Sequence, residues 1–158
     1  MKSVARLVAC LVLCYGIAAI GGWSTIPNIP TWYAGLVKPA WTPPNWLFPV
    51  VWNTLYGLIA VSLWLLWDRT PETPMRSQAL KLFLAQLALN TLWSPVFFAL
   101  HYVWFGLAII LGMIVLVVLT IRTAWGINRW AALLLVPYLV WISYASTLNA
   151  GIGIMNPR

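Results

Sequence analysis

The sequence predicts an all-α integral membrane protein whose five transmembrane helices form a single bundle. Its composition excludes a soluble globule and a disordered chain. Of the 158 residues, 63% are apolar and only 7% are charged, whereas about 25% of the residues in a soluble domain are charged. The mean hydropathy is +0.89. The apolar residues also gather in five long runs that lack the alternation of transmembrane strands.

Each run predicts one helix, and together the five helices make one domain of residues 1–158. Each run is close to the roughly 20 residues that a helix needs to cross about 30 Å of hydrocarbon. The predicted helices cover residues 4–26, 46–67, 80–100, 103–122 and 130–152. Because the connections after the third helix are short, we expect the last three helices to run antiparallel as neighbours.

The connection between the first two helices, residues 27–45, is rich in proline. It contains Pro27, Pro30, Pro39, Pro43 and Pro44. Such a segment has little backbone freedom to lose on folding and cannot be helical throughout. We therefore expect an ordered lid on the outer face of the bundle.

The basic residues predict the orientation of the chain in the membrane. With a cytoplasmic N-terminus, the inner segments hold seven of them, namely Lys2, Arg6, Arg69, Arg76, Lys81, Arg122 and Arg129. The outer segments hold only Lys38 and Arg158. The positive-inside rule thus predicts a cytoplasmic N-terminus and an outer C-terminus. An alternative is that the first run is a signal peptide with a cleavage site near residues 19–21, which would leave four helices.

Several kinds of chemistry are not expected. The basic residues are scattered, so the sequence predicts no nucleic-acid binding. The predicted spans hold no acidic or basic residue deep inside, which disfavours a proton-coupled transporter, and no motif for acid–base or nucleophilic catalysis is present. No metal site is expected. His101, the only histidine, is either an interfacial hydrogen-bonding residue or an axial haem ligand.

Small residues recur every four positions along the first predicted helix. They are Cys10, Cys14, Ala18 and Gly22. This spacing lets another helix approach closely, and it is our interpretation of both cysteines, because a disulfide between residues four apart on a helix has poor geometry.

Tryptophan is the residue in excess, with twelve in the chain. Nine of them fall near helix ends, as in the aromatic belts of membrane proteins. Trp52, Trp93 and Trp141 instead come out at a shared depth between the midplane and the outer surface, by the 1.5 Å rise per residue of a helix. They form either part of the core or the walls of a pocket.

Polar residues beside these three tryptophans favour a pocket. Helical spacing places Gln86, Asn90, Trp93 or Ser94, and Phe97 on one face of the third helix. By the same spacing Tyr138, Trp141, Ala145 and Leu148 share one face of the last helix, and the second helix adds Pro49, Trp52 and Tyr56. Amides that face lipid unpaired are costly, so these faces should converge. For Gln86 and Asn149, hydrogen bonding between helices is an equal alternative. Pro95 and Pro137 should bend their helices and leave space.

Five sequence blocks resemble one family over nearly the whole chain. They are Trp32-Tyr33, residues 38–44 (KPAWTPP), the stretch with Pro49, Trp52 and Tyr56, residues 90–98 (NTLWSPVFF) and residues 136–141 (VPYLVW). They are similar to the TspO/MBR family of tryptophan-rich sensory proteins and translocator proteins, formerly the peripheral benzodiazepine receptors.

The resemblance implies a five-helix bundle, often a homodimer, with a ligand cavity under the first loop. Family ligands include protoporphyrin IX and haem, benzodiazepine-type drugs and, in eukaryotes, cholesterol. The family pocket corresponds here to Trp32, Tyr33, Pro43, Trp52, Tyr56, Asn90, Trp141, Ala145 and Leu148, to which the helix faces above add Trp93, Phe97 and Tyr138. The sterol consensus needs a basic residue shortly after a tyrosine, and Arg158 is too far from Tyr138 and Tyr144, so the chain departs from this consensus.

These observations predict a sensor or carrier in the inner membrane of a bacterium that binds porphyrins and related hydrophobic ligands in tetrapyrrole or stress regulation, with no obligatory cofactor. Trp52 and Trp141 would present flat faces to the macrocycle, and Asn90 would form one hydrogen bond that orients it. Tyr33 and the proline-rich loop would close the outer mouth of the pocket. One alternative is an enzyme that degrades porphyrin in light, with Trp52 and Trp141 as the photochemical residues. Another is a regulatory subunit of another membrane complex.

Overall fold

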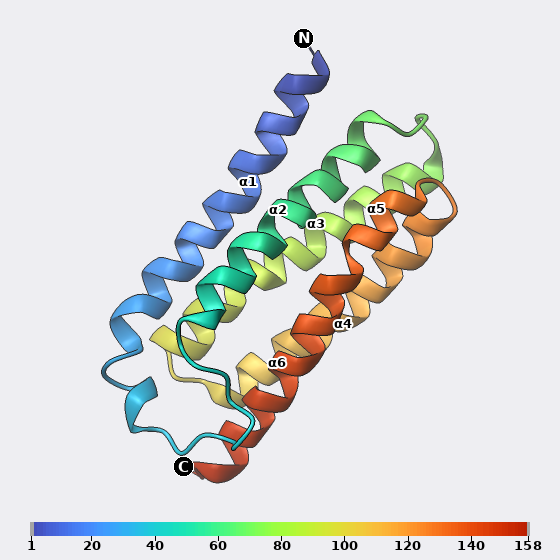
Figure 1. The fold of residues 1–158 in the computed structure, drawn as a ribbon. Coiled ribbons are helices and arrows are strands. Elements are labelled where there is room, and N and C mark those ends of the chain that lie inside the picture. Colours follow the sequence, from blue (N-terminus) through green and yellow to red (C-terminus); the bar gives the residue numbers. More distant parts are fainter. Residues whose placement is uncertain (1, 158) are drawn as a thin grey trace.

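The computed structural model describes residues 2–157, and this part of the chain is helical without a strand. Five helical segments are long and apolar enough to cross a membrane (Figure 1). They are Lys2–Asn28, Leu47–Asp68, Pro74–Ala99, Val103–Trp125 and Arg129–Met155. The predicted all-α membrane fold with five transmembrane helices is therefore confirmed.

The described residues form six α-helices and three short helical turns. The α-helices are α1 (Lys2–Thr25), α2 (Leu47–Asp68), α3 (Pro74–Ser94), α4 (Val103–Trp125), α5 (Arg129–Leu134) and α6 (Val136–Met155). Two 3-10 turns, η1 (Ile26–Asn28) and η2 (Tyr33–Gly35), lie between α1 and α2, and a π-helical turn, η3 (Pro95–Ala99), follows α3.

The third helix begins at Pro74 rather than at residue 80 as predicted. The Thr73 hydroxyl accepts a hydrogen bond of 3.2 Å from the backbone N–H of Arg76, and proline occupies the first helical turn, where no N–H is needed. This capping signal extends the helix beyond its apolar run.

The predicted fifth helix consists of two helices that meet at Leu135. Pro137 has no N–H, so it cannot donate to the carbonyl of Leu133 as a residue within a helix would. At the junction, the N–H of Leu135 donates to the carbonyl of Ala132, three residues earlier, at 3.1 Å. Pro95 has a related effect, because the helix continues from it as the π-turn η3, in which the N–H of Leu100 donates to the Pro95 carbonyl at 2.9 Å.

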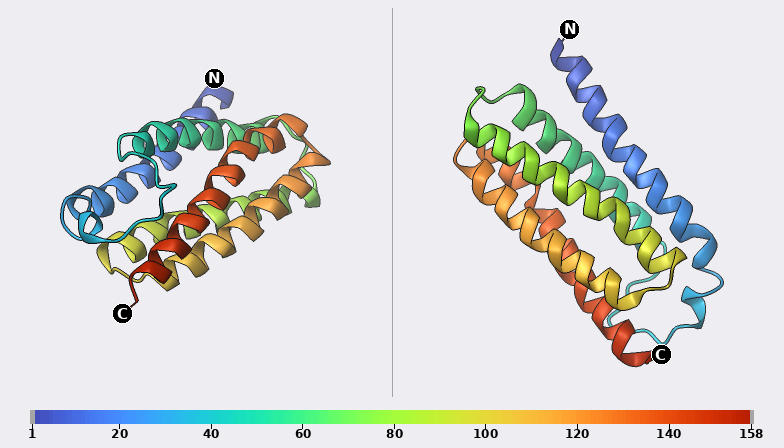
Figure 2. Two further views of the ribbon diagram at one scale, coloured as in Figure 1. Left: turned by 60° about the horizontal axis from the view of Figure 1, so that its bottom comes forward. Right: turned by 180° about the vertical axis from the view of Figure 1, so that it is seen from behind.

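The spans pack in a closed ring. α1 packs against α2 and α3, α3 against α4, α4 against α5 and α6, and α5 against α2 (Figure 2). α2 scarcely touches α6, because the two helices separate toward the end of the bundle where the C-terminus lies. We call this end the lid end. The short connections after α3 place α3, α4 and α6 side by side, as predicted.

Residues 26–46, which we call the lid, are fastened to α6. The Tyr144 hydroxyl donates to the carbonyl of Trp41 at 2.5 Å. The Asn156 side chain accepts from the backbone N–H of Val37 at 3.0 Å and donates to the Val37 carbonyl at 2.8 Å. The predicted ordered loop is thus held by side chains of the last span.

The other side of the lid is held by an aromatic cluster. Trp32 stacks on His101, with ring centroids 4.3 Å apart, and packs edge-on against Phe97 at 5.4 Å. His101 Nε2 also lies 3.3 Å from Asn28 Oδ1. His101 has a φ of 61°, a left-handed conformation that is uncommon for a residue other than glycine. Through its contacts with Trp32 and Asn28, His101 joins the α3–α4 connection to the lid.

Candidate functional site

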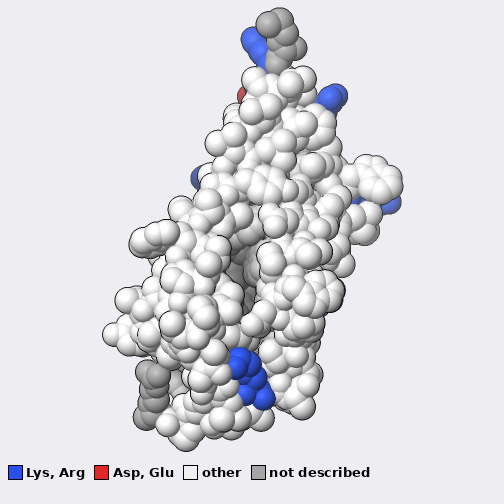
Figure 3. Space-filling view, turned by 60° about the vertical axis from the view of Figure 1, so that its left-hand side comes forward, with Lys and Arg blue, Asp and Glu red and all other residues white. Residues whose placement is uncertain are grey.

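A cavity of about 380 Å³ lies beneath the lid, where α2 and α6 separate. Its opening is visible on the molecular surface as a hollow (Figure 3). α1, η1 and the lid contribute Ala18, Gly21, Gly22, Thr25, Ile26, Ile29, Tyr33 and Asn45 to the lining; α2 contributes Phe48, Pro49, Trp52, Asn53 and Tyr56; α3, η3 and α6 contribute Asn90, Trp93, Ser94, Phe98, Trp141 and Ala145. The volume falls in the range of small-molecule sites, about 300–1,000 Å³.

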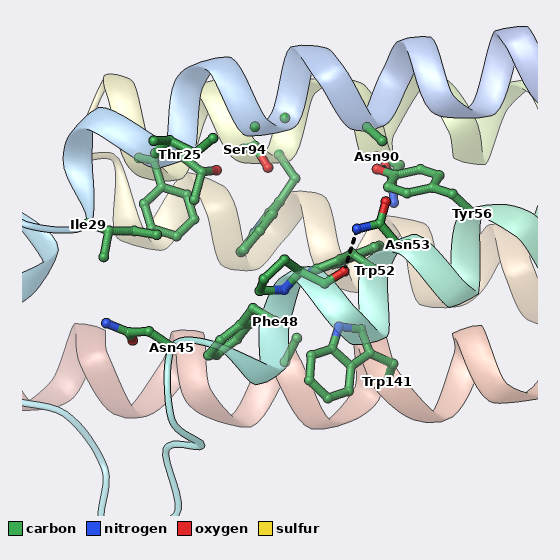
Figure 4. A pocket seen from close by; sticks show the side chains of 18 of the residues that line it. Thr25, Ile29, Asn45, Phe48, Trp52, Asn53, Tyr56, Asn90, Ser94 and Trp141 are labelled. Atoms are coloured by element: carbon green, nitrogen blue, oxygen red, sulfur yellow. Dashed lines mark hydrogen bonds between the residues drawn. The ribbon is translucent and has the colours of Figure 1, made fainter.

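Three tryptophans from three different helices line this cavity. Trp52 comes from α2, Trp93 from α3 and Trp141 from α6, and all three are half-buried. Figure 4 shows Trp52 and Trp141 beside Phe48 on one side of the space, with Thr25 and Ser94 on the other. The tryptophans that sequence depth set apart from the interfacial ones therefore meet around a common space.

Hydrogen bonds and ring contacts position these indoles. Trp93 Nε1 donates to Asn149 Oδ1 at 3.3 Å, and the Asn149 amide donates to the Val103 carbonyl at 2.7 Å. Trp141 meets Phe48 edge-on at 5.9 Å between ring centroids, and Trp52 lies 5.5 Å from Tyr56. The aromatic walls are thus largely preformed.

The opposite wall is formed by small residues of α1. Ala18, Gly21 and Gly22 line the cavity, and a Cβ atom added at Gly21 would already approach Ser94 Oγ to 3.4 Å. The four-residue spacing in the sequence had indicated helix packing alone. Cys10 and Cys14 do pack in the core, and Ala18 packs against that core, but Ala18 and Gly22 also line the cavity.

A chain of buried hydrogen bonds closes the deep end of the cavity. The Tyr56 hydroxyl donates to Asn90 Oδ1 at 2.6 Å, and Asn90 Nδ2 donates to the Tyr138 oxygen at 2.9 Å. The Tyr138 hydroxyl in turn donates to Met113 Sδ at 3.4 Å. Asn90 is only 5% exposed, so it serves first to join α2, α3 and α6.

Tyr33 lines the cavity from the lid and is buried itself. Burial, and secondarily the neighbouring Tyr144 phenol, raises the pKa of the Tyr33 phenol above its usual range. The Lys38 ammonium lies over the Tyr33 ring, 4.8 Å from its centroid.

Of the twelve side chains in the predicted site, seven line the cavity: Tyr33, Trp52, Tyr56, Asn90, Trp93, Trp141 and Ala145. The other five do not. Trp32 packs from the lid against Phe97 of η3, and Tyr138 is buried behind Asn90. Leu148 is buried on α6, and Pro43 is half-buried within the lid.

Sequence reasoning missed several lining residues, above all the α1 wall, Phe48, Asn53 and Phe98. Some signals were available. Phe98 belongs to the tryptophan-rich block around Trp93, and Asn53 follows Trp52 directly. Asn53 donates to the Pro49 carbonyl at 2.8 Å (Figure 4), which satisfies its amide within α2.

The residues that line the cavity are mostly apolar and aromatic. Within the part of the chain that the structure describes, the lining carries no charged side chain, and its polar groups are neutral hydroxyls and amides. Among residues 2–157, no cluster of three histidine, cysteine or acidic residues is placed to hold a metal ion. His101 is stacked on Trp32 and does not line the cavity. The geometry suits a flat, apolar molecule held between aromatic faces.

Fold and site together define a class: integral membrane helix bundles with an aromatic ligand pocket under a proline-rich loop. Within this class, the sequence profile of the TspO/MBR family matches residues 9–155. The chain belongs to the TspO/MBR family.

Individual relatives agree with this assignment. The chain is 40% identical over 154 residues to the tryptophan-rich protein TspO of Archaeoglobus fulgidus, covering 98% of this chain and 99% of the relative. It is 36% identical over 140 residues to protein CrtK of Rhodobacter capsulatus, with 89% and 88% covered. It is 37% identical over 119 residues to the human translocator protein, with 75% and 70% covered.

Proposed function

We propose that this protein is a membrane sensor or carrier that binds porphyrins, such as protoporphyrin IX and haem, and related flat hydrophobic ligands in the cavity beneath the lid. The observation that carries the proposal is the meeting of Trp52, Trp93 and Trp141 around one uncharged cavity. Indole rings stack on flat conjugated systems, and each such contact adds about 0.5–1.5 kcal/mol to the burial of apolar area.

Family membership supports a role in sensing or translocation, because relatives carry the names tryptophan-rich sensory protein and translocator protein. The membrane we propose is the inner membrane of a bacterium. A haem ligand would rely on stacking here, since His101 lies outside the cavity lining. Porphyrin is then a ligand rather than a permanent cofactor.

The test is a titration of the purified protein with protoporphyrin IX, followed by the Soret band and by tryptophan quenching. We expect saturable binding by the wild type and about tenfold or weaker binding by a Trp52→Ala, Trp141→Ala double variant, since two stacking contacts are lost. A matched Trp23→Ala, Trp130→Ala variant should bind like the wild type, because these indoles are 81% and 72% exposed and line no part of the cavity. Wild-type affinity in the first variant would refute the proposed site.

Illumination of the same complex distinguishes binding from catalysis. Trp52 and Trp141 are electron-rich rings at the cavity wall, which is the observation that favours a light-dependent reaction. Loss of the Soret band with a new bilin-like absorbance, dependent on these two residues, would show that the protein degrades its ligand. A stable Soret band would leave binding as the function. A stoichiometric partner protein together with no affinity for porphyrin would instead indicate a regulatory subunit.

A further inference from the structure

We infer that Lys38 binds a carboxylate carried by the ligand, so that the pocket selects flat apolar molecules with an acidic group at one edge. This inference rests on the proposed function and adds the chemical class of ligand. It follows from the place of one cation, from the charge distribution of the whole chain and from the size of the cavity.

The Lys38 ammonium does not line the cavity itself, but it lies against Tyr33, which does. Its nitrogen donates to the carbonyl of Leu36 at 3.0 Å and reaches the carbonyl of Ala34 at 3.4 Å. It also lies over the face of Tyr33, whose ring lines the cavity. An ammonium has three N–H donors, so one remains for a ligand after the carbonyls of Leu36 and Ala34 have each accepted a hydrogen bond.

No acidic side chain balances this charge. The chain has only two, and both lie at the end of the bundle opposite the lid. There Asp68 pairs with Arg6 at 3.0 Å and Arg69 at 3.3 Å, and Glu72 pairs with Arg76 at 3.0 Å. Among the described residues, Lys38 is the one lysine or arginine at the lid end, and atoms of lysine or arginine lie just below the hollow in Figure 3.

The size of the cavity sets how a macrocycle would enter. At about 380 Å³ the space lies at the lower end of the range for small-molecule pockets, so a tetrapyrrole would leave one edge at the mouth. The apolar rings would lie between the tryptophans, where no charge is available to meet an acid group. The acidic edge would lie outward beside Lys38, where reduced exposure to water strengthens an ion pair.

The experiment compares protoporphyrin IX with its dimethyl ester, which has the same ring and no acid group. Binding is measured in nanodiscs of zwitterionic lipid, for the wild type, Lys38→Gln, Lys38→Arg and the control Lys81→Gln, whose side chain is exposed on α3 far from the cavity. We expect the wild type, Lys38→Arg and Lys81→Gln to bind the acid about tenfold more tightly than the ester, and Lys38→Gln to lose this preference. The preference should also shrink with added salt.

A lid disturbed by the substitution would weaken acid and ester alike, so the ratio of the two affinities isolates the ion pair. Equal affinities for acid and ester in the wild type, or an unchanged ratio in Lys38→Gln, would overturn the inference and leave porphyrin binding standing. Loss of the preference when phosphatidylglycerol is added would assign Lys38 to a lipid phosphate and would also overturn it.

Failure of both macrocycles to bind would refute the proposed porphyrin function. Pyrenebutyric acid and its methyl ester then decide the inference by the same ratio, because pyrene is a smaller flat apolar ring with the same acidic group. An acid preference that depends on Lys38 would support the inference, and equal binding of the pair would overturn it.

Discussion

Tyr56, Asn90 and Tyr138 show how single polar side chains hold this bundle together. Asn90 accepts from Tyr56 and donates to Tyr138, so it links three helices within the apolar interior. We expect Asn90→Leu to lower the free energy of unfolding by about 2 kcal/mol, because the Tyr56 hydroxyl then loses its acceptor while it stays buried. Tyr56→Phe should cost about 1 kcal/mol.

Unfolding of both single variants and of the double variant in detergent micelles measures the coupling between the two side chains. Hydrogen bonds between membrane helices give roughly 0.6–1.7 kcal/mol in such cycles, and we expect a value in this range. Strictly additive effects would contradict a direct Tyr56–Asn90 bond. Thr54→Val is a matched control, since the Thr54 hydroxyl bonds only to the Val50 carbonyl of its own helix.

The residues on these helix faces show which parts of the site could be predicted from the sequence. Helical spacing correctly placed Asn90, Trp93 and Trp141 toward the interior, but it gives only the face of a helix. Whether a side chain on that face lines a space or packs against a neighbour depends on the distance between helices. Tyr138 is therefore buried behind Asn90 instead of lining the cavity. Likewise Asn149 pairs between helices, whereas the amide of Gln86 is buried with no partner among the described residues.

At the scale of elements, the lid depends on a glycine of α6. A Cβ atom at Gly151 would clash with the Pro39 ring, so only glycine lets the lid lie this close. We expect Gly151→Ala to displace the lid and to weaken ligand binding at least fivefold. The matched change Gly16→Ala lies on an exposed face of α1 with no atom within 4 Å of the added Cβ, and it should leave binding unchanged.

Hydrogen exchange at residues 36–42 reports the lid position directly. Faster exchange of these amides in Gly151→Ala than in Gly16→Ala would agree with a displaced lid. If both variants exchanged and bound ligand like the wild type, the lid would not be held by this contact. The stability of Gly16→Ala provides a further check, because alanine within a helix gains up to about 1 kcal/mol over glycine.

Element boundaries were predicted less well than element identities. The apolar runs located all five spans, because lipid requires about 20 apolar residues whatever their packing. They could not show that α3 begins at the Thr73 cap, since its first turns carry Arg76 and other polar residues. Pro137 predicted a bend in the last span, yet the break between α5 and α6 also depends on a partner helix. The Ser62 hydroxyl of α2 donates to the Ala131 carbonyl at 2.7 Å.

At the scale of the whole molecule, charge divides the bundle into two unlike ends. Both acidic side chains and all described basic ones except Lys38 gather at the end opposite the lid. There Arg6 lies 5.4 Å from the centroid of Trp67, and Arg69 lies 5.0 Å from that of Trp64. Arg158, the other basic residue predicted on the outer side, lies outside the described residues.

The predicted homodimer stays a prediction, which light scattering of the detergent complex would test.

This asymmetry predicts that the lid faces away from the cytoplasm, because short loops rich in lysine and arginine are retained on the cytoplasmic side. Single cysteines test it on a background in which Cys10 and Cys14, both buried, are replaced by alanine. Gly35→Cys lies in the lid with open space around its Cβ, and Gln78→Cys is exposed at the opposite end. A membrane-impermeant maleimide should label Gly35→Cys in intact cells and Gln78→Cys only after permeabilisation. The reverse pattern would place the pocket mouth on the cytoplasmic side, and ligands would then reach Lys38 from within the cell.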